Sequence, residues 1–310
     1  MTTIYSSLYT QLSDFLIRLT GMRVPASLLF STEGNASGTR GLLAPDGILH
    51  SKYTHRKAGR ASYILCWRPA VLKLQKGGFK RFSPHLTYSP RLPNYIAHLL
   101  RLRVLQEFEL LAERLEYRVK TFKKQKAYST VILRRLTRVE WGLMRSSGLI
   151  PYQNALAVLI VPPVNKDVVT RTRPKGSMSA APPEVDDHTK PARPLSVLMP
   201  VSQNVDTELT PQAVVPLYNC TTAFPNRFQR SALYSILVRI LVSERFEKKQ
   251  LREASVSSPR NEGVESSKAS HAFLLCSNED TGKRGDVAGI ARALWRLKMF
   301  EGEGWEHSIV

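Results

Sequence analysis

The sequence predicts a protein of the α+β or α/β class with three parts. These are a basic, loop-rich N-terminal arm (residues 1–92), a long basic helix or helical hairpin (93–148) and a small C-terminal α/β sheet domain (149–310). Proline and glycine punctuate the first part, apolar residues recur at helical spacing in the second, and apolar runs alternate with polar loops in the third. The hydrophobic fraction of 43% is typical of globular proteins.

The first residues favour an amphipathic helix that could serve as an import leader. Its apolar stripe consists of Tyr5, Leu8, Leu12, Phe15, Leu16 and Leu19. The stretch to residue 93 holds 13 Lys and Arg but only three acids, Asp14, Glu33 and Asp46. Acid-poor leaders with Arg and Ser direct import into mitochondria, so we expect the mitochondrial matrix, with the nucleus as the alternative. The same stripe also fits an ordinary helix that packs on the body.

Cations and aromatic residues are interleaved in residues 24–92, which also hold a strand candidate at Ser62–Trp67 followed by Ala70–Leu74. Phosphates pair with cations and unstacked bases lie on aromatic rings, so this alternation favours an RNA surface. An extended arm whose aromatic residues anchor it to a neighbouring protein would show the same pattern. The candidate nucleic-acid-binding residues of this part are Arg56, Lys57, Arg60, Lys80 and Arg81.

A helix is predicted from Pro93 to Ser147, because this stretch contains no further proline and its first glycine is Gly142. A heptad seam is formed by Leu105, Phe108, Ala112, Leu115, Val119 and Phe122. An offset second stripe follows with Tyr128, Ile132, Leu136, Val139 and Leu143. The offset predicts either one long curved helix or a hairpin that turns near Lys124–Ala127. The seam of helix 93–148 could bind a protein partner.

The interval between Glu116 and Glu140 contains no acid but eight cations: Arg118, Lys120, Lys123, Lys124, Lys126, Arg134, Arg135 and Arg138. Such a run repels itself and is normally offset by an anionic polymer, most often nucleic acid. We therefore expect these eight residues to bind nucleic acid. An acidic protein, an anionic membrane surface contacted peripherally, or a nuclear-targeting role are the alternatives.

Strands alternate with helices after residue 149, which predicts a small α/β sheet. The strand candidates are Ala155–Val161, Leu195–Val201, a weaker Ala213–Tyr218 and His271–Cys276. Asn226 is expected to cap a helix that runs to about Leu251, and a last helix is expected over Gly285–Phe300. The polar inserts 165–194 and 253–270 are expected to be mobile loops.

The sequence carries no recognisable catalytic or metal-binding motif, so we expect no cofactor, no metal and no enzyme activity. Its three cysteines form no C-x-x-C pair, and its seven histidines have no metal-ligand spacing. Gly282-Lys283 resembles part of a P-loop, but Ser277 stands where the first glycine is needed and Arg284 replaces Ser or Thr. The expectation for this turn is therefore solvent exposure, with Asp286 capping the last helix. The longest apolar run, 155–164, is too short to span a membrane.

The protein has a formal net charge of +20, and most of it lies in the N-terminal half. Residues 1–149 hold 25 Lys and Arg but only eight acids. A basic extension, a long basic helix and a compact body resemble organellar ribosomal or ribosome-associated proteins. This resemblance implies a non-catalytic, RNA- or ribosome-binding role in mitochondrial gene expression. The alternatives are an assembly or scaffold factor for a mitochondrial membrane complex and, third, a nucleotide-using α/β enzyme. The RNA hypothesis fails if carboxylates of the C-terminal portion already neutralise the N-terminal cations.

Overall fold

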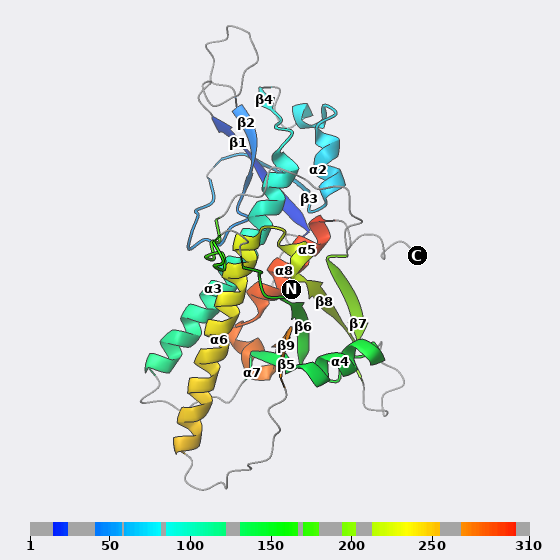
Figure 1. The fold of residues 1–310 in the computed structure, drawn as a ribbon. Coiled ribbons are helices and arrows are strands. Elements are labelled where there is room, and N and C mark those ends of the chain that lie inside the picture. Colours follow the sequence, from blue (N-terminus) through cyan, green and yellow to red (C-terminus); the bar gives the residue numbers. More distant parts are fainter. Residues whose placement is uncertain are drawn as a thin grey trace, which may run out of the picture. The chain divides into compact units, whose positions relative to one another are not determined.

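Helices and two mixed β-sheets make up the computed structural model, which describes residues 15–23, 41–57, 59–81, 85–121, 131–166, 170–179, 194–202, 213–254 and 268–301 (Figure 1). The α+β class is therefore confirmed. The chain divides into two compact units. Unit 1 consists of residues 1–103 and 292–310, and unit 2 of residues 104–291. The division passes through helices α3 (Leu92–Thr121) and α8 (Ala288–Phe300).

A four-stranded sheet forms the centre of unit 1. Its order is β3 (Ala61–Leu65), β1 (Leu16–Arg23), β2 (Gly41–Asp46), β4 (Leu86–Thr87). Strand β1 pairs antiparallel with both β2 and β3, and β4 pairs parallel with β2. Helix α2 (Arg68–Leu74) and the 3₁₀ helix η2 (Gly78–Arg81) follow β3. The buried apolar side chains of β1 and β2 include Ile17, Leu19 and Leu43.

This sheet corrects the expectation of a loop-rich arm. The predicted strand at Ser62–Trp67 is confirmed by β3, but the segment from Ala70 lies in α2, where Pro69 occupies the first helical turn. Leu16 and Leu19 belong to a strand instead of the predicted N-terminal helix. Pairing on both edges of β1 satisfies its backbone, and this tertiary pairing overrides the helical spacing. The leader residues before Phe15 lie outside the described part.

Helix α3 begins beside Pro93, as predicted, and its apolar side is buried. The second predicted helical stripe is wrong at residues 133–137, which form strand β5 (Leu133–Thr137). Helix is confirmed over Arg138–Ser147, which form a separate helix, α4. Pairing with a neighbouring strand holds Leu133–Arg135 and Thr137 in a strand, with Leu136 at a bulge between them. Thr137 then starts a new helix through a capping box with Glu140. Val139 and Leu143 are exposed on α4.

Unit 2 is built on a five-stranded sheet in which only one pair is parallel. Its order is β5, β9 (Ala269–Cys276), β6 (Ala155–Ile160), β8 (Val214–Asn219), β7 (Ser196–Pro200). Strands β6 and β8 run parallel, whereas β5–β9, β9–β6 and β8–β7 are antiparallel. All four strands predicted after residue 149 are thus confirmed.

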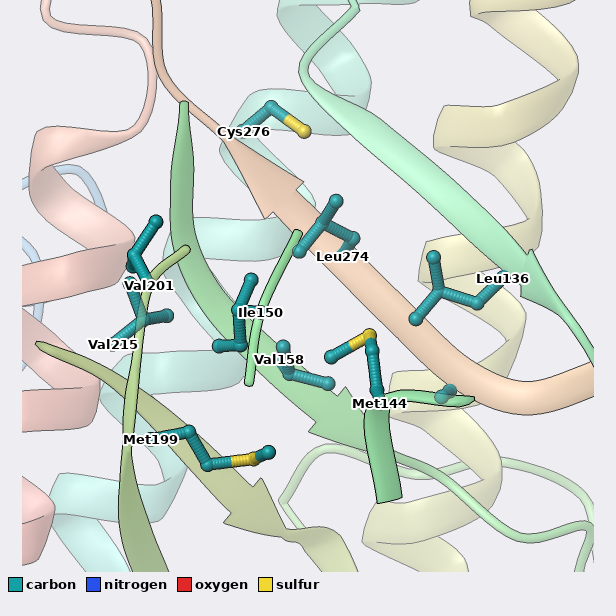
Figure 2. Packing of buried hydrophobic residues seen from close by; sticks show 10 residues of the cluster. Leu136, Met144, Ile150, Val158, Met199, Val201, Val215, Leu274 and Cys276 are labelled. Carbon is teal, nitrogen blue, oxygen red and sulfur yellow. The ribbon is translucent and has the colours of Figure 1, made fainter. Parts of the chain in front are cut away.

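Both faces of this sheet are covered. One face carries the apolar cluster of Figure 2, which Met144 of α4 and Ile150 cover; its other members are Leu136, Val158, Met199, Val201, Val215, Ala272, Leu274 and Cys276. Successive side chains of a strand point to opposite faces, so Phe273 faces the other way. There its ring meets Tyr234 of α6 (Arg227–Ala254) edge to face, with 6.2 Å between centroids.

Asn226 caps α6 as predicted, since its Oδ1 accepts a 2.8 Å hydrogen bond from the Phe228 amide. The short helices α5 (Cys220–Ala223) and α7 (Glu279–Arg284) complete the unit, and α8 confirms the last predicted helix. Helix α6 extends through Ala254, so the second insert starts later than residue 253; residues 255–267 lie outside the described part.

Part of the first insert, predicted to be mobile, is packed on α6. The Ser231 hydroxyl donates to the Pro174 carbonyl (2.8 Å), and the Gln229 amide nitrogen donates to the Met178 carbonyl (3.0 Å). Gly176 makes the close approach possible, because a Cβ there would lie 2.8 Å from the backbone of Ala232. These bonds join Pro174 and Met178 to α6, and the mobility of the insert stays a prediction.

Candidate nucleic-acid interface

Asp46 organises the basic loop that follows β2. The carboxylate is 5% exposed, lies 3.4 Å from the Arg18 guanidinium, and accepts the Lys57 amide at 3.2 and 3.3 Å. Arg18 in turn donates a 2.9 Å hydrogen bond to the Lys57 carbonyl. Gly47, at φ 67°, leaves room for Arg56, whose Nε would lie 2.9 Å from a Cβ at this position. These contacts fix the backbone at residues 56 and 57 while their side chains remain exposed.

Within its described residues, unit 1 has few acids to offset its cations. Its described ranges hold 17 Lys and Arg but two acids, Asp46 and Glu301. Asp46 is paired with Arg18, and Glu301 lies 3.2 Å from Arg68 and 2.7 Å from Arg101. Eight exposed cations make no ion pair with any described residue: Arg56, Lys57, Arg60, Lys73, Lys76, Lys80, Arg81 and Arg91. All five N-terminal candidates belong to this set.

A second basic segment of unit 1 runs through α2 and η2. Lys73 lies in the last turn of α2, and Lys80 and Arg81 lie in η2, where cations interact favourably with the negative ends of helices. Apolar contacts and one hydrogen bond hold this segment in place. Val71 is fully buried, and its carbonyl accepts a 3.3 Å hydrogen bond from the Tyr88 hydroxyl. The ring centroids of Phe79 and Tyr88 are 6.0 Å apart. Phe79 and Tyr88 thus pack on each other instead of presenting both rings to solvent.

Arg118 is neutralised from within unit 2. Its Nη2 donates a 2.7 Å hydrogen bond to Asp286, whose carboxylate is 1% exposed. Arg114 and Arg284 also contact this carboxylate, at 3.5 and 3.2 Å. The expectation that Asp286 caps the last helix from a solvated turn is therefore wrong: three guanidinium groups draw its carboxylate into the interior. No sequence motif signals this cluster, because its members come from α3, α7 and the turn before α8.

The described cations that remain in the interval 117–138 do not all lie on one surface. Lys120 is exposed at the end of α3, and Lys123, Lys124 and Lys126 lie outside the described residues. Arg134 and Arg135 are neighbours in β5 and contact different groups. Arg134 pairs with Glu140 and lies 5.0 Å from the Tyr152 ring centroid.

Arg135 instead donates a 2.8 Å hydrogen bond to the Ser270 carbonyl and lies over the Phe273 ring. Tyr152 packs against the cluster of Figure 2 and Phe273 faces α6, so the two arginines lie on opposite faces of the sheet. Arg138 is exposed at the start of α4. Strand alternation thus places Arg134 and Arg135, two of the eight expected nucleic-acid-binding residues, on different faces of the sheet.

The seam of α3 is already occupied by the protein's own core. Leu105, Phe108 and Ala112 are fully buried and Leu115 is 2% exposed. Helix α6 lies beside this part of α3 (Figure 1), and Arg239 of α6 binds two α3 carboxylates, Glu109 at 2.6 Å and Glu116 at 2.9 Å. The predicted binding of a partner through these seam positions is therefore wrong. Phe122 lies outside the described part.

Gly282 and Lys283, predicted to lie in a turn, belong to helix α7, and the turn that leads into this helix offers no open phosphate site. Asn278 caps α7 by accepting the Thr281 amide at 2.8 Å, and the fully buried Thr281 hydroxyl contacts the Asn278 backbone. Glu279 and Asp280 occupy the first turn, where they repel a phosphate. Because the cap uses an amide that a phosphate would need, the structure does not support the nucleotide hypothesis at this turn.

The three cysteines are buried, and the described ranges hold no candidate metal site. Cys66, Cys220 and Cys276 are buried thiols, and burial raises the pKa of Cys220 to about 12. Across the residues described, no three His, Cys, Asp or Glu side chains are grouped so that they could hold a metal ion. None of the described helices is both long enough and apolar enough to cross a membrane.

Sequence reasoning thus found the cationic N-terminal set but missed its organiser, Asp46, and the Asp286 cluster. Asp46 carries one local signal, the following Gly47, which is typical of a turn. Its pairing with Arg18 depends on strand register, which the sequence does not show. Comparison of the chain with family models, with curated proteins and with solved structures finds no match.

Proposed function

We propose that the protein binds RNA through the exposed cations of unit 1. One observation carries the proposal: both acids in the described ranges of this unit are paired internally, while eight exposed cations are not. Over its full sequence unit 1 holds 18 Lys and Arg and six acids, whereas unit 2 holds 27 and 19. The charge excess is thus concentrated in the smaller unit, which favours a polyanionic partner.

The same observation favours a functional role over a merely solvated surface. Surface charges of globular proteins are usually of mixed sign, which limits self-repulsion. Among the described residues of unit 1, the eight exposed cations have no carboxylate partner that would relieve their mutual repulsion. Phosphates at the spacing of a nucleic acid would offset this repulsion and release their own counterions, so binding should weaken steeply with salt.

A salt titration with the full-length protein and a hairpin RNA tests the proposal. Log affinity should fall linearly with log salt, with a slope of roughly −0.7 to −0.9 per neutralised phosphate. Replacing Arg56, Lys57 and Arg60 by Ala should make the slope shallower by about two to three. A flat slope for the unmodified protein would overturn the proposal.

A charge-matched control separates a localised interface from general attraction to net charge. Arg171, Arg173 and Lys175 are exposed in unit 2 and were not among the candidates. Replacing these three by Ala removes the same charge and should change the slope much less than the unit 1 triple variant. Equal changes would contradict binding through unit 1.

We further propose that the RNA belongs to a mitochondrial ribosomal particle in the matrix. The support is the acid-poor, basic N-terminal region and the compositional resemblance described above. The tagged protein should sediment with ribosomal particles and be released by RNase. Because β1 is an inner strand of its sheet, cleavage of a leader would have to leave the residues from Phe15 onward in place.

A further inference from the structure

Tyr63 is an aromatic side chain exposed on a strand at the edge of the unit 1 sheet. It lies in β3, the edge strand, and is 59% exposed. In the antiparallel register it stands opposite Arg18, which in turn stands opposite Asp46 of β2. Directly opposed residues share a face, so Tyr63, Arg18 and Asp46 form one row across the sheet.

The row beside Tyr63 is made of small side chains. Ala61 of β3, Thr20 of β1 and Ala44 of β2 stand opposite one another on the same face. Thr20 and Ala44 are buried, at 5% and 8% exposed, so the accessible part of this face is the edge strand that carries Tyr63. On its other side, Leu65 is 43% exposed and extends the apolar strip along β3. A flat apolar group could therefore lie against Tyr63 along this exposed edge of the sheet.

The unpaired cations next to this face are those of the Asp46 loop. Asp46 belongs to the same row as Tyr63 and binds the Lys57 amide, which holds residues 56 and 57 at this side of the sheet. Arg60 immediately precedes β3. Arg18 itself is neutralised by Asp46, so Arg56, Lys57 and Arg60 supply the unbalanced charge.

We propose that this face binds an unpaired segment of RNA, with one base stacked on Tyr63 and the adjoining phosphates at Arg56, Lys57 and Arg60. This inference rests on the proposed RNA binding and specifies single strands as its substrate class. A base inside a duplex is already stacked on both sides, so the exposed ring discriminates in favour of single-stranded nucleotides. The loop cations supply the sequence-independent attraction that accompanies such stacking.

The experiment measures binding of the full-length protein to a labelled 12-nucleotide RNA, single-stranded or annealed to its complement. The unmodified protein should prefer the single strand. Tyr63→Ala and Tyr63→Thr should each weaken single-strand binding about tenfold, while Tyr63→Phe, which keeps the ring, should stay within about twofold. The salt slope should not change, because no phosphate contact is removed. Tyr117→Ala, at a 68% exposed tyrosine of unit 2, is the matched control.

The outcomes separate the two proposals. Salt-dependent RNA binding that is unaffected by Tyr63→Ala and Tyr63→Thr overturns stacking at this face and leaves RNA binding by unit 1 standing. Absence of salt-dependent binding overturns both. Tyr63→Thr is included because threonine favours strands, so β3 should stay formed in this variant even if Tyr63→Ala weakens it. A thermal melt of each variant checks that it is folded. Equal loss with Tyr63→Phe also contradicts stacking, since the phenyl ring stacks as well.

Discussion

Arg118 and Asp286 are joined by a 2.7 Å hydrogen bond although 168 residues separate them in the chain. The acid-free run from Arg118 to Arg138 therefore contains an arginine that a C-terminal carboxylate already neutralises. The condition under which RNA binding would fail is met at Arg118. It is not met for the eight exposed cations of unit 1 within the described residues. The charge argument therefore loses Arg118, and its main support among the described residues is the set of eight exposed cations of unit 1.

The Asp286 cluster should be a major source of stability. Asp286→Asn removes the charge that three arginines share at a site 1% exposed, so we expect the free energy of unfolding to fall by about 3 kcal/mol. Urea denaturation of the full-length protein measures this. Asp280→Asn, at an exposed position in the neighbouring helix, should change stability by less than about 0.5 kcal/mol. Equal losses of unfolding free energy in the two variants would show that the buried Asp286 carboxylate stabilises the protein no more than an exposed one does.

Glu247 provides a pH-dependent test of the same region. Burial raises its pKa, while nearby Arg118 and Arg284 lower it and Asp286 raises it. A carboxyl whose folded-state pKa is raised favours folding when protonated, and this contribution is lost as the pH rises through the folded pKa. Glu247→Gln should therefore be about as stable as the unmodified protein below pH 4 and more stable at pH 7. A variant that is less stable at pH 7 would contradict this sign.

Glu116 should show the opposite dependence. Its hydrogen bond with Arg239 lowers its pKa, although burial acts weakly the other way. A lowered folded-state pKa contributes stability at neutral pH that disappears as the pH falls through that value. Glu116→Gln should destabilise the protein at pH 7 by about 0.5–1 kcal/mol, since the side chain is one-third exposed, and by less at pH 3. Unfolding curves at the two pH values check the prediction.

The sequence predicted the elements whose signals are local and missed those fixed by pairing. Asn226 predicts the start of its helix because an N-cap residue bonds to backbone within three residues. The segment 155–160 predicts a buried strand because it is continuously apolar. Leu16–Leu19 has helical spacing yet becomes a strand, since its partners β2 and β3 lie far along the chain. Asp46 and Asp286 are likewise defined by distant arginines, which a single sequence does not place.

The close approach of Glu107 and Gly289 yields the last prediction. Glu107 is 6% exposed, and a Cβ at Gly289 of α8 would lie 2.9 Å from its Cδ and closer still to Oε2. Gly289→Ala would force this buried carboxylate to move, so we expect a loss of about 1–3 kcal/mol despite the better helix propensity of alanine. Gly282→Ala is the matched control, because nothing lies within 4 Å of its Cβ position in α7. That substitution should leave stability unchanged or raise it by up to about 1 kcal/mol, and thermal denaturation of the two variants side by side would reveal a clash only at Gly289.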